Sequence, residues 1–170
     1  TSRCRLREMT VADGRKMSQK NTFACPVYKK CGGCQLLNME YQAQLNFKRG
    51  QVAKLLKPYG KIEEMIGMEQ PAHYRHKVHA AFGRDRKAII VSGIYKEGTH
   101  QIVSVEECLL ENEKADAIIQ TIRKLLKSFK IKTYDEDTGY GLLRHVLVRV
   151  GYQTGQIMVV LVLGSPIMPS

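Results

Sequence analysis

The sequence predicts an α+β fold in which a mostly antiparallel sheet is packed with two main helices, beside a cysteine-rich loop. Runs rich in Val and Ile are separated by turns of hairpin length, which predicts the sheet. Two stretches carry apolar residues at helical spacing. Three cysteines fall within ten residues, at positions 25, 31 and 34, and they define the loop. The 170 residues suffice for one domain with a core plus appendages.

The first 60 residues divide into an arm, the cysteine loop and a helix. Residues 1–24 are polar and basic without periodicity, so we expect an arm or linker there. In segment 25–60, Asn38 is placed to cap a helix that runs to about Lys57 and holds the cysteine loop in place. Its expected apolar stripe consists of Tyr41, Leu45, Val52, Leu55 and Leu56.

Residues 61–170 are expected to form a central α+β domain that begins with three strands. The first, 74–83, places Val78 and Phe82 on one side and Arg75, Lys77 and His79 on the other. This basic side is interpreted equally well as an RNA contact or as a solvated sheet face. Strands over 88–95 and 101–105 follow.

The remaining elements are a helix and two strands. Asn112 caps a helix that runs to Phe129, whose apolar face comprises Ala115, Ile118, Ile119, Ile122, Leu125, Leu126 and Phe129. The acidic residues 135–139 are interpreted as a turn in preference to a Mg²⁺ site. Strands over 142–150 and 156–163 end the domain, and the apolar run 157–163 is expected to be buried.

The cysteine spacing C-x5-C-x2-C, with Cys108 further along, predicts a metal centre. Gly32 and Gly33 permit the turn that directs the sulfurs to one point. Because the spacing matches neither common ferredoxin pattern, zinc and an iron–sulfur cluster both remain open on spacing alone. Five cysteines cannot all pair, and no secretory or membrane-spanning segment is visible, so we expect a reducing, cytoplasmic setting without disulfides. Cys4 is interpreted as a free thiol in preference to a ligand.

The charge predicts a polyanionic partner. The chain has 27 Lys and Arg against 16 Asp and Glu, a net charge of +11, and a pI near 9.5. Nucleic acid is the first candidate. A membrane surface is less favoured as a partner, because the sequence shows no basic amphipathic helix with exposed large apolar groups. We expect the protein to be a monomer.

The usual enzyme motifs are missing from this sequence. It contains neither of the glycine-rich nucleotide-binding motifs, G-x-G-x-x-G after a strand or G-x-x-x-x-G-K-[ST]. It also contains no H-E-x-x-H and no G-x-S-x-G motif. His76 and His79 would point to opposite faces of their strand and so not share a metal. The sequence starts at Thr1 without Met and stops shortly after a strand, so we expect an excerpt of a longer protein.

Six motifs in order resemble the iron–sulfur-containing RNA (uracil-5-)-methyltransferases, and most closely their 23S ribosomal RNA branch. They run from about Ala24 to Leu163. The motifs are Cys25-Pro26-Val27-Tyr28-x2-Cys31-Gly32-Gly33-Cys34-Gln35-Leu36, Tyr41-x2-Gln44-Leu45-x-Phe47-Lys48, Tyr74-Arg75-x-Lys77, Gly93-Ile94-Tyr95-x2-Gly98, Ile102-Val103-x3-Glu107-Cys108 and Leu143-Arg144-His145.

The resemblance implies a [4Fe-4S] cluster on Cys25, Cys31, Cys34 and Cys108. It also implies that a Rossmann-like domain with S-adenosylmethionine and the catalytic cysteine lies outside this segment. We therefore expect this segment alone to be inactive, and to bind ribosomal RNA through Arg75, Lys77 and Arg144. The alternative for Arg144 is an ion pair with a carboxylate such as Asp135 or Glu136, which would fix the acidic loop. A stand-alone zinc- or iron–sulfur-stabilised RNA-binding module and an electron-transfer protein are the alternatives.

Overall fold

The computed structural model describes residues 24–96 and 98–165. The predictions for the arm and for Cys4 therefore lie outside the described residues, except at residue 24. The elements in chain order are helices α1 (Tyr28–Cys31) and α2 (Tyr41–Leu56), the 3-10 turn η1 (Lys57–Tyr59), strands β1 (Lys77–Arg84), β2 (Ile90–Tyr95) and β3 (Ile102–Ser104), helix α3 (Glu113–Ser128), and strands β4 (Leu143–Val150) and β5 (Ile157–Leu163). None of the helices in the described part of the chain is long and apolar enough to cross a membrane.

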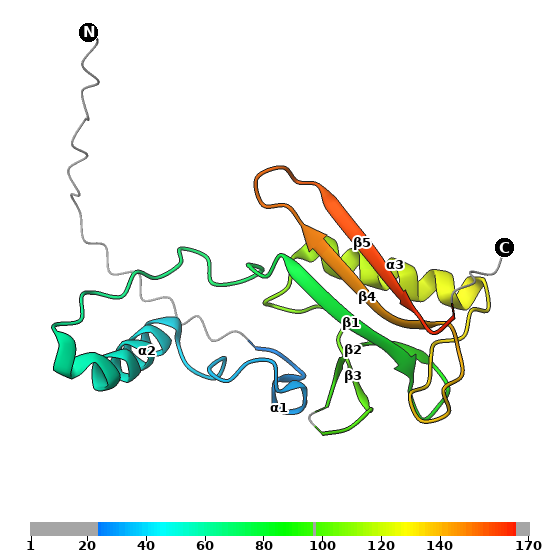
Figure 1. The fold of residues 1–170 in the computed structure, drawn as a ribbon, viewed down its shortest axis with the longest axis horizontal. Coiled ribbons are helices and arrows are strands. Elements are labelled where there is room, and N and C mark those ends of the chain that lie inside the picture. Colours follow the sequence, from blue (N-terminus) through cyan, green and yellow to red (C-terminus); the bar gives the residue numbers. More distant parts are fainter. Residues whose placement is uncertain (1–23, 97, 166–170) are drawn as a thin grey trace, which may run out of the picture.

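The five strands form one sheet in the order β3-β2-β1-β4-β5, and every neighbouring pair is antiparallel (Figure 1). The predicted α+β class is therefore confirmed. The β1–β2 turn forms because the Asp85 carboxylate accepts hydrogen bonds from the backbone N–H groups of Lys87 and Ile89, both at 2.9 Å.

Strand β1 begins three residues later than the sequence indicated. The backbone of Arg75 is bonded elsewhere: its N–H donates to the Leu110 carbonyl at 2.8 Å, and its carbonyl accepts from the Asn112 N–H at 3.0 Å. The chain before β1 is thus paired with the segment that leads into α3, and the sheet starts only where this pairing ends.

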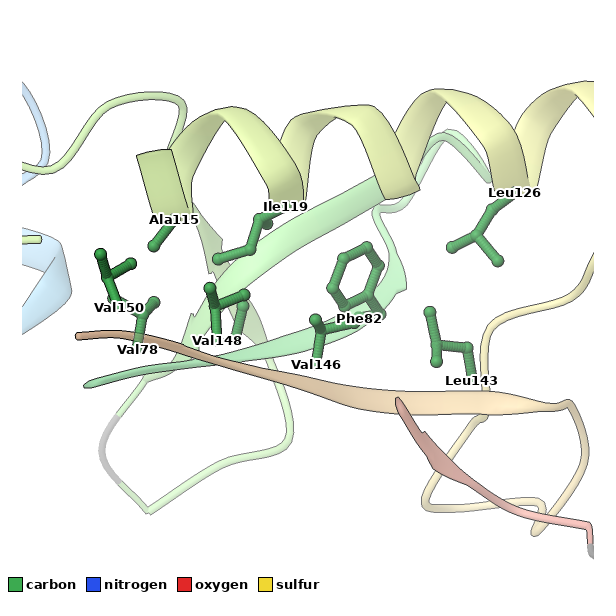
Figure 2. Close-up of a cluster of buried hydrophobic side chains, with 10 residues drawn as sticks. Val78, Phe82, Ala115, Ile119, Leu126, Leu143, Val146, Val148 and Val150 are labelled. Atoms are coloured by element: carbon green, nitrogen blue, oxygen red, sulfur yellow. The ribbon is translucent and has the colours of Figure 1, made fainter. Parts of the chain in front are cut away.

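The core lies between α3 and one face of the sheet (Figure 2). Phe82 of β1 and Val146 and Val148 of β4 are buried, and they face Ala115, Ile119 and Leu126 of α3. The expected cap is confirmed, because the Asn112 side chain accepts from the Lys114 N–H at 3.1 Å. Two residues assigned to the buried helix face are instead exposed: Leu125 and Phe129 flank the buried stripe.

Helix α2 departs from the prediction. It begins at Tyr41 and not after Asn38, whose side-chain oxygen accepts from the Tyr28 hydroxyl at 3.0 Å. None of its residues is buried, and Leu55 of the expected stripe is 73% exposed. The expectation that both main helices pack on the sheet therefore holds only for α3, and α2 lies apart from it (Figure 1).

Strand β5 was expected to be buried and is not. It is an edge strand that pairs with β4 alone in the described part of the chain. Residues 157–161 are all large and apolar, yet each is 40–47% exposed. Strand β5 is therefore an apolar strand that is partly exposed on both faces. The hydrophobic pattern of the sequence cannot distinguish such a strand from a buried one.

Replacing Phe82 with Ala should lower the free energy of unfolding by about 3–5 kcal/mol, because a large buried ring leaves a cavity between α3 and the sheet. Chemical denaturation measures this. Phe129→Ala is the matched control: its ring is exposed, so its loss should cost no more than about 0.5 kcal/mol. Similar losses for the two variants would contradict the assignment of the core.

Candidate metal centre and the adjoining sheet face

The cysteine loop is shaped by one helical turn and a glycine. Helix α1 ends at Cys31, where Gly32 adopts a φ of 68°, the left-handed conformation that favours glycine. The Tyr28 hydroxyl donates to Asn38 and, more weakly, to the Gln35 carbonyl at 3.3 Å. The loop is thus closed by Tyr28, and the predicted turn between the cysteines is confirmed.

The structure brings three of the four predicted ligands to one cavity. Cys31, Cys34 and Cys108 line the same cavity, and all four cysteines are free of disulfides. Burial, followed by the neighbouring charges of Cys31 and Cys25, raises the pKa of Cys34. Cys25 is therefore close enough to interact with Cys34 electrostatically.

These residues fit a thiolate-bound group by their chemistry. Free sulfurs within one partly buried region are the donors that iron–sulfur clusters and zinc take from proteins. As they stand, no three His, Cys, Asp or Glu side chains among residues 24–96 and 98–165 are grouped tightly enough to hold a single metal ion. The geometry of any bound group is thus not preformed in these side chains.

Cys108 is positioned by a carboxylate that the sequence analysis did not identify. The Cys108 backbone N–H donates to Asp116 Oδ2 at 2.9 Å, and the Cys108 carbonyl accepts from the Glu111 N–H at 3.2 Å. Burial raises the pKa of Cys108, with the charges of Glu111 and Asp116 acting in the same direction. Asp116 lies in the first turn of α3, and the sequence alone does not show that Cys108 returns to that helix.

Arg75 belongs to this cavity and not to β1. It lines the cavity beside Cys34, where its charge opposes the rise in the Cys34 pKa. Burial and a hydrogen bond with Asp116 raise the pKa of Glu111 to about 7, and Arg75 again acts in the opposite direction. Arg75 is exposed, so contact with RNA remains a prediction, but it does not share a strand face with Lys77.

Arg144, which was predicted to bind RNA, is engaged by a carboxylate. Its guanidinium forms a two-pronged pair with Glu136, with Nη2 at 2.8 Å from Oε2 and Nε at 3.0 Å from Oε1. It also lies 4.7 Å from the ring centre of Tyr134. Arg144 thus forms the carboxylate pair that was the alternative interpretation, and its contact with RNA stays a prediction. The acidic loop itself is the expected turn, since the Asp135 side chain accepts from the Asp137 and Thr138 N–H groups.

Three aromatic residues that the sequence does not group together lie side by side next to these sites. The rings of His79 and His145 are 4.8 Å apart, and the ring of Tyr95 lies 5.9 Å from that of His145. They come from strands β1, β4 and β2, so only the register of the sheet brings them together. Lys77 is exposed and pairs in register with Arg149, which is also exposed.

The sequence matches no family model. It does match proteins named "uncharacterized RNA methyltransferase". It is 42% identical over 142 residues to one from Clostridium tetani, which covers 81% of this chain and 31% of the relative. For one from Clostridium acetobutylicum the identity is 39% over 161 residues, covering 91% and 35%. For one from Halalkalibacterium halodurans it is 41% over 143 residues, covering 81% and 31%.

A solved structure also resembles this chain. It is the crystal structure of Pyrococcus abyssi tRNA (uracil-54, C5)-methyltransferase in complex with S-adenosyl-L-homocysteine. The TM-score is 0.66 and the identity 26%, over 82% of this chain and 33% of that one. This chain therefore spans about one third of the length of the relatives and of the solved structure that it matches.

Removing the Asp116 carboxylate with Asp116→Ala should make Cys108 more reactive in the metal-free chain, because the Cys108 N–H loses its acceptor and the thiol becomes more accessible. Alkylation followed by peptide mass spectrometry measures the rate at Cys108. Asp116→Asn keeps an acceptor oxygen and should change the rate less. Asp137→Ala, in the distant acidic loop, is the control, and an equal increase in that variant would argue against a local effect.

Proposed function

We propose that this chain is the cluster-binding and RNA-contacting part of an RNA (uracil-5-)-methyltransferase. Most of its length matches about one third of the length of each of several proteins named RNA methyltransferases. One observation carries the proposal. In a chain with such relatives, cysteines from two distant segments, Cys31 and Cys34 on one side and Cys108 on the other, line a single cavity.

The bound group in this proposal is a [4Fe-4S] cluster on Cys25, Cys31, Cys34 and Cys108. Free thiols, the glycine turn at Gly32 and the hydrogen bond that holds Cys108 all support a ligand role. The electrostatic coupling of Cys25 to Cys34 supports the fourth position. Zinc is the alternative metal at this site. We also propose a cytoplasmic location, which would keep the thiols reduced.

Methyl transfer is assigned to the part of the longer protein that lies outside this third. There, S-adenosylmethionine would supply the methyl group that ends on C5 of uracil. The support is that the solved relative is named as a uracil C5 methyltransferase and contains S-adenosyl-L-homocysteine. The residues of this chain would bind and orient RNA, which agrees with its net charge of +11.

For the substrate we propose 23S ribosomal RNA, on the basis of the cysteine motif. The solved relative is named as a transfer RNA enzyme, so transfer RNA is the specific competitor. Competition between a ribosomal RNA stem-loop and transfer RNA for binding to this chain separates the two. Preferential binding of transfer RNA would overturn the ribosomal assignment and leave the RNA methyltransferase proposal in place.

Anaerobic purification should yield a chain that contains iron and sulfide and absorbs visible light, as a [4Fe-4S] protein does. Cys108→Ser should lose far more iron than Cys4→Ser, because Cys108 is held in the cavity by Asp116. Iron and sulfide assays on the two variants measure this. Stoichiometric zinc without iron would favour a zinc-stabilised RNA-binding module over the iron–sulfur cluster. Equal iron loss in both variants would refute the ligand assignment.

Binding to a ribosomal RNA stem-loop should weaken as salt rises, and less steeply after charge is removed. For Arg75→Ala/Lys77→Ala, each lost phosphate contact should reduce the slope of log affinity against log salt by about 0.9 at most. Lys124→Ala/Lys127→Ala, which removes the same charge from exposed positions of α3, is the control. An unchanged slope and affinity in Arg75→Ala/Lys77→Ala would mean that neither residue touches RNA. Strong RNA binding by the wild-type chain would argue against the alternative of an electron-transfer protein.

A further inference from the structure

The sheet has a second face, which α3 does not cover. Val78 and Phe82 point to α3, so the residues that alternate with them, Lys77, His79 and Ala81, point the other way. Directly paired residues of an antiparallel sheet lie on the same face. The register pairs Lys77 with Arg149 and Ala81 with both His145 and Gly93, and Tyr95 lies two residues beyond Gly93.

Three rings stand together at the centre of this face. The centres of the His79 and His145 rings are 4.8 Å apart, with 43° between their planes, and Tyr95 meets His145 edge-on at 84°. His79 is exposed, and Tyr95 and His145 are half-buried. Burial, then the charges of His79 and Arg144, lowers the pKa of His145, which favours the neutral ring near pH 7.

The charges around the rings are mainly positive. Lys77 and Arg149 are exposed on the same face, and neither forms an ion pair with any residue in the described ranges. Two carboxylates approach the ring cluster, and both have partners: Glu136 binds Arg144, and Asp137 accepts from His100 at 2.9 Å. The positive groups therefore remain available to an anionic ligand.

We propose that this open sheet face is a stacking platform for unpaired RNA bases. His79, His145 and Tyr95 present ring faces and edges to the bases, and Lys77 and Arg149 bind phosphates of the same strand. Single strands suit such a surface because their bases can be unstacked and placed on aromatic side chains, whereas a duplex hides its base faces. The inference rests on the proposed RNA-binding function and adds the form of RNA and the residues that select it.

A protein partner fits the centre of this face less well. The large exposed apolar side chains lie on the edge strand β5, at residues 157–161, and of these Met158 and Val160 share the open face with Arg149 and Leu147 of β4. The centre combines aromatic rings with unpaired Lys and Arg, which is typical of surfaces that bind single-stranded nucleic acid.

The test compares three RNA probes of equal length with the full 170-residue chain, using fluorescence anisotropy at fixed salt. The first probe is a uridine-rich single strand, the second has the same backbone with abasic sites, and the third is a duplex. The wild-type chain should bind the single strand about tenfold more tightly than the abasic strand, because the two differ in bases and not in phosphates.

The variant His79→Ala/Tyr95→Leu should bind the two single strands with nearly equal affinity and retain most of its affinity for the abasic one. Tyr95→Phe keeps a ring and should preserve the preference. Phe129→Ala removes an exposed ring from the end of α3 and should leave all three affinities unchanged. Thermal unfolding of each variant shows that the fold is intact.

Three results would overturn the inference: no wild-type preference for bases, an unchanged preference in His79→Ala/Tyr95→Leu, or an equal effect of Phe129→Ala. A preference for the duplex would also contradict it. In each of these cases salt-dependent RNA binding by the wild type would leave the proposed function standing. Absence of any RNA binding would instead contradict the proposed function itself.

Discussion

A short backbone pairing between residues 73–75 and 109–112 is the constraint on which the rest of the structure depends. The His73 N–H donates to the Leu109 carbonyl at 2.8 Å, and Arg75 exchanges two hydrogen bonds with Leu110 and Asn112. This pairing determines where β1 starts. It also places Asn112 where it caps α3, and it brings Cys108 to the cavity that Cys31 and Cys34 line.

Once that pairing is made, the helix contributes to both the core and the candidate metal centre. Ala115 and Ile119 pack on the sheet, while Asp116, between them in sequence, points to the Cys108 backbone. The first turns of α3 therefore couple hydrophobic packing to the position of a candidate ligand. A change that shifts α3 on the sheet would therefore also shift Cys108, because Asp116 of α3 accepts the hydrogen bond of the Cys108 N–H.

The two faces of the sheet differ because only one is covered by a helix. On the covered face, Val and Phe side chains are buried against α3. On the open face, the alternating residues include the rings of His79 and His145 and the charges of Lys77 and Arg149. Half-buried Leu147 and Val91 and buried Ala81 and Gly83 lie on the same face. Strand β5 is apolar on both faces and exposed on both, which is typical of surfaces that contact another part of a larger protein or a partner.

Much of this protein follows from the sequence because the signals are local. Strand and helix types, the cap at Asn112, the turn at Asp135 and the glycine turn between the cysteines each depend on neighbouring residues, and the structure agrees with them. Periodicity also identified the side of α3 that is buried at Ala115 and Ile119. It did not reveal whether a partner exists, so the stripe of α2 and the apolar run of β5 were both expected to be covered.

Tertiary structure alone decided which distant residues meet. The sequence determined that four candidate ligand cysteines, an excess of positive charge and the strands of an antiparallel sheet are present. It did not determine that Asp116 holds Cys108 or that His79, Tyr95 and His145 share one face, and it left open which partner Arg144 takes. Each of these contacts depends on strand register or on the pairing of residues 73–75 with 109–112. Such long-range pairings arise from the packing of the whole chain, and no local pattern specifies them.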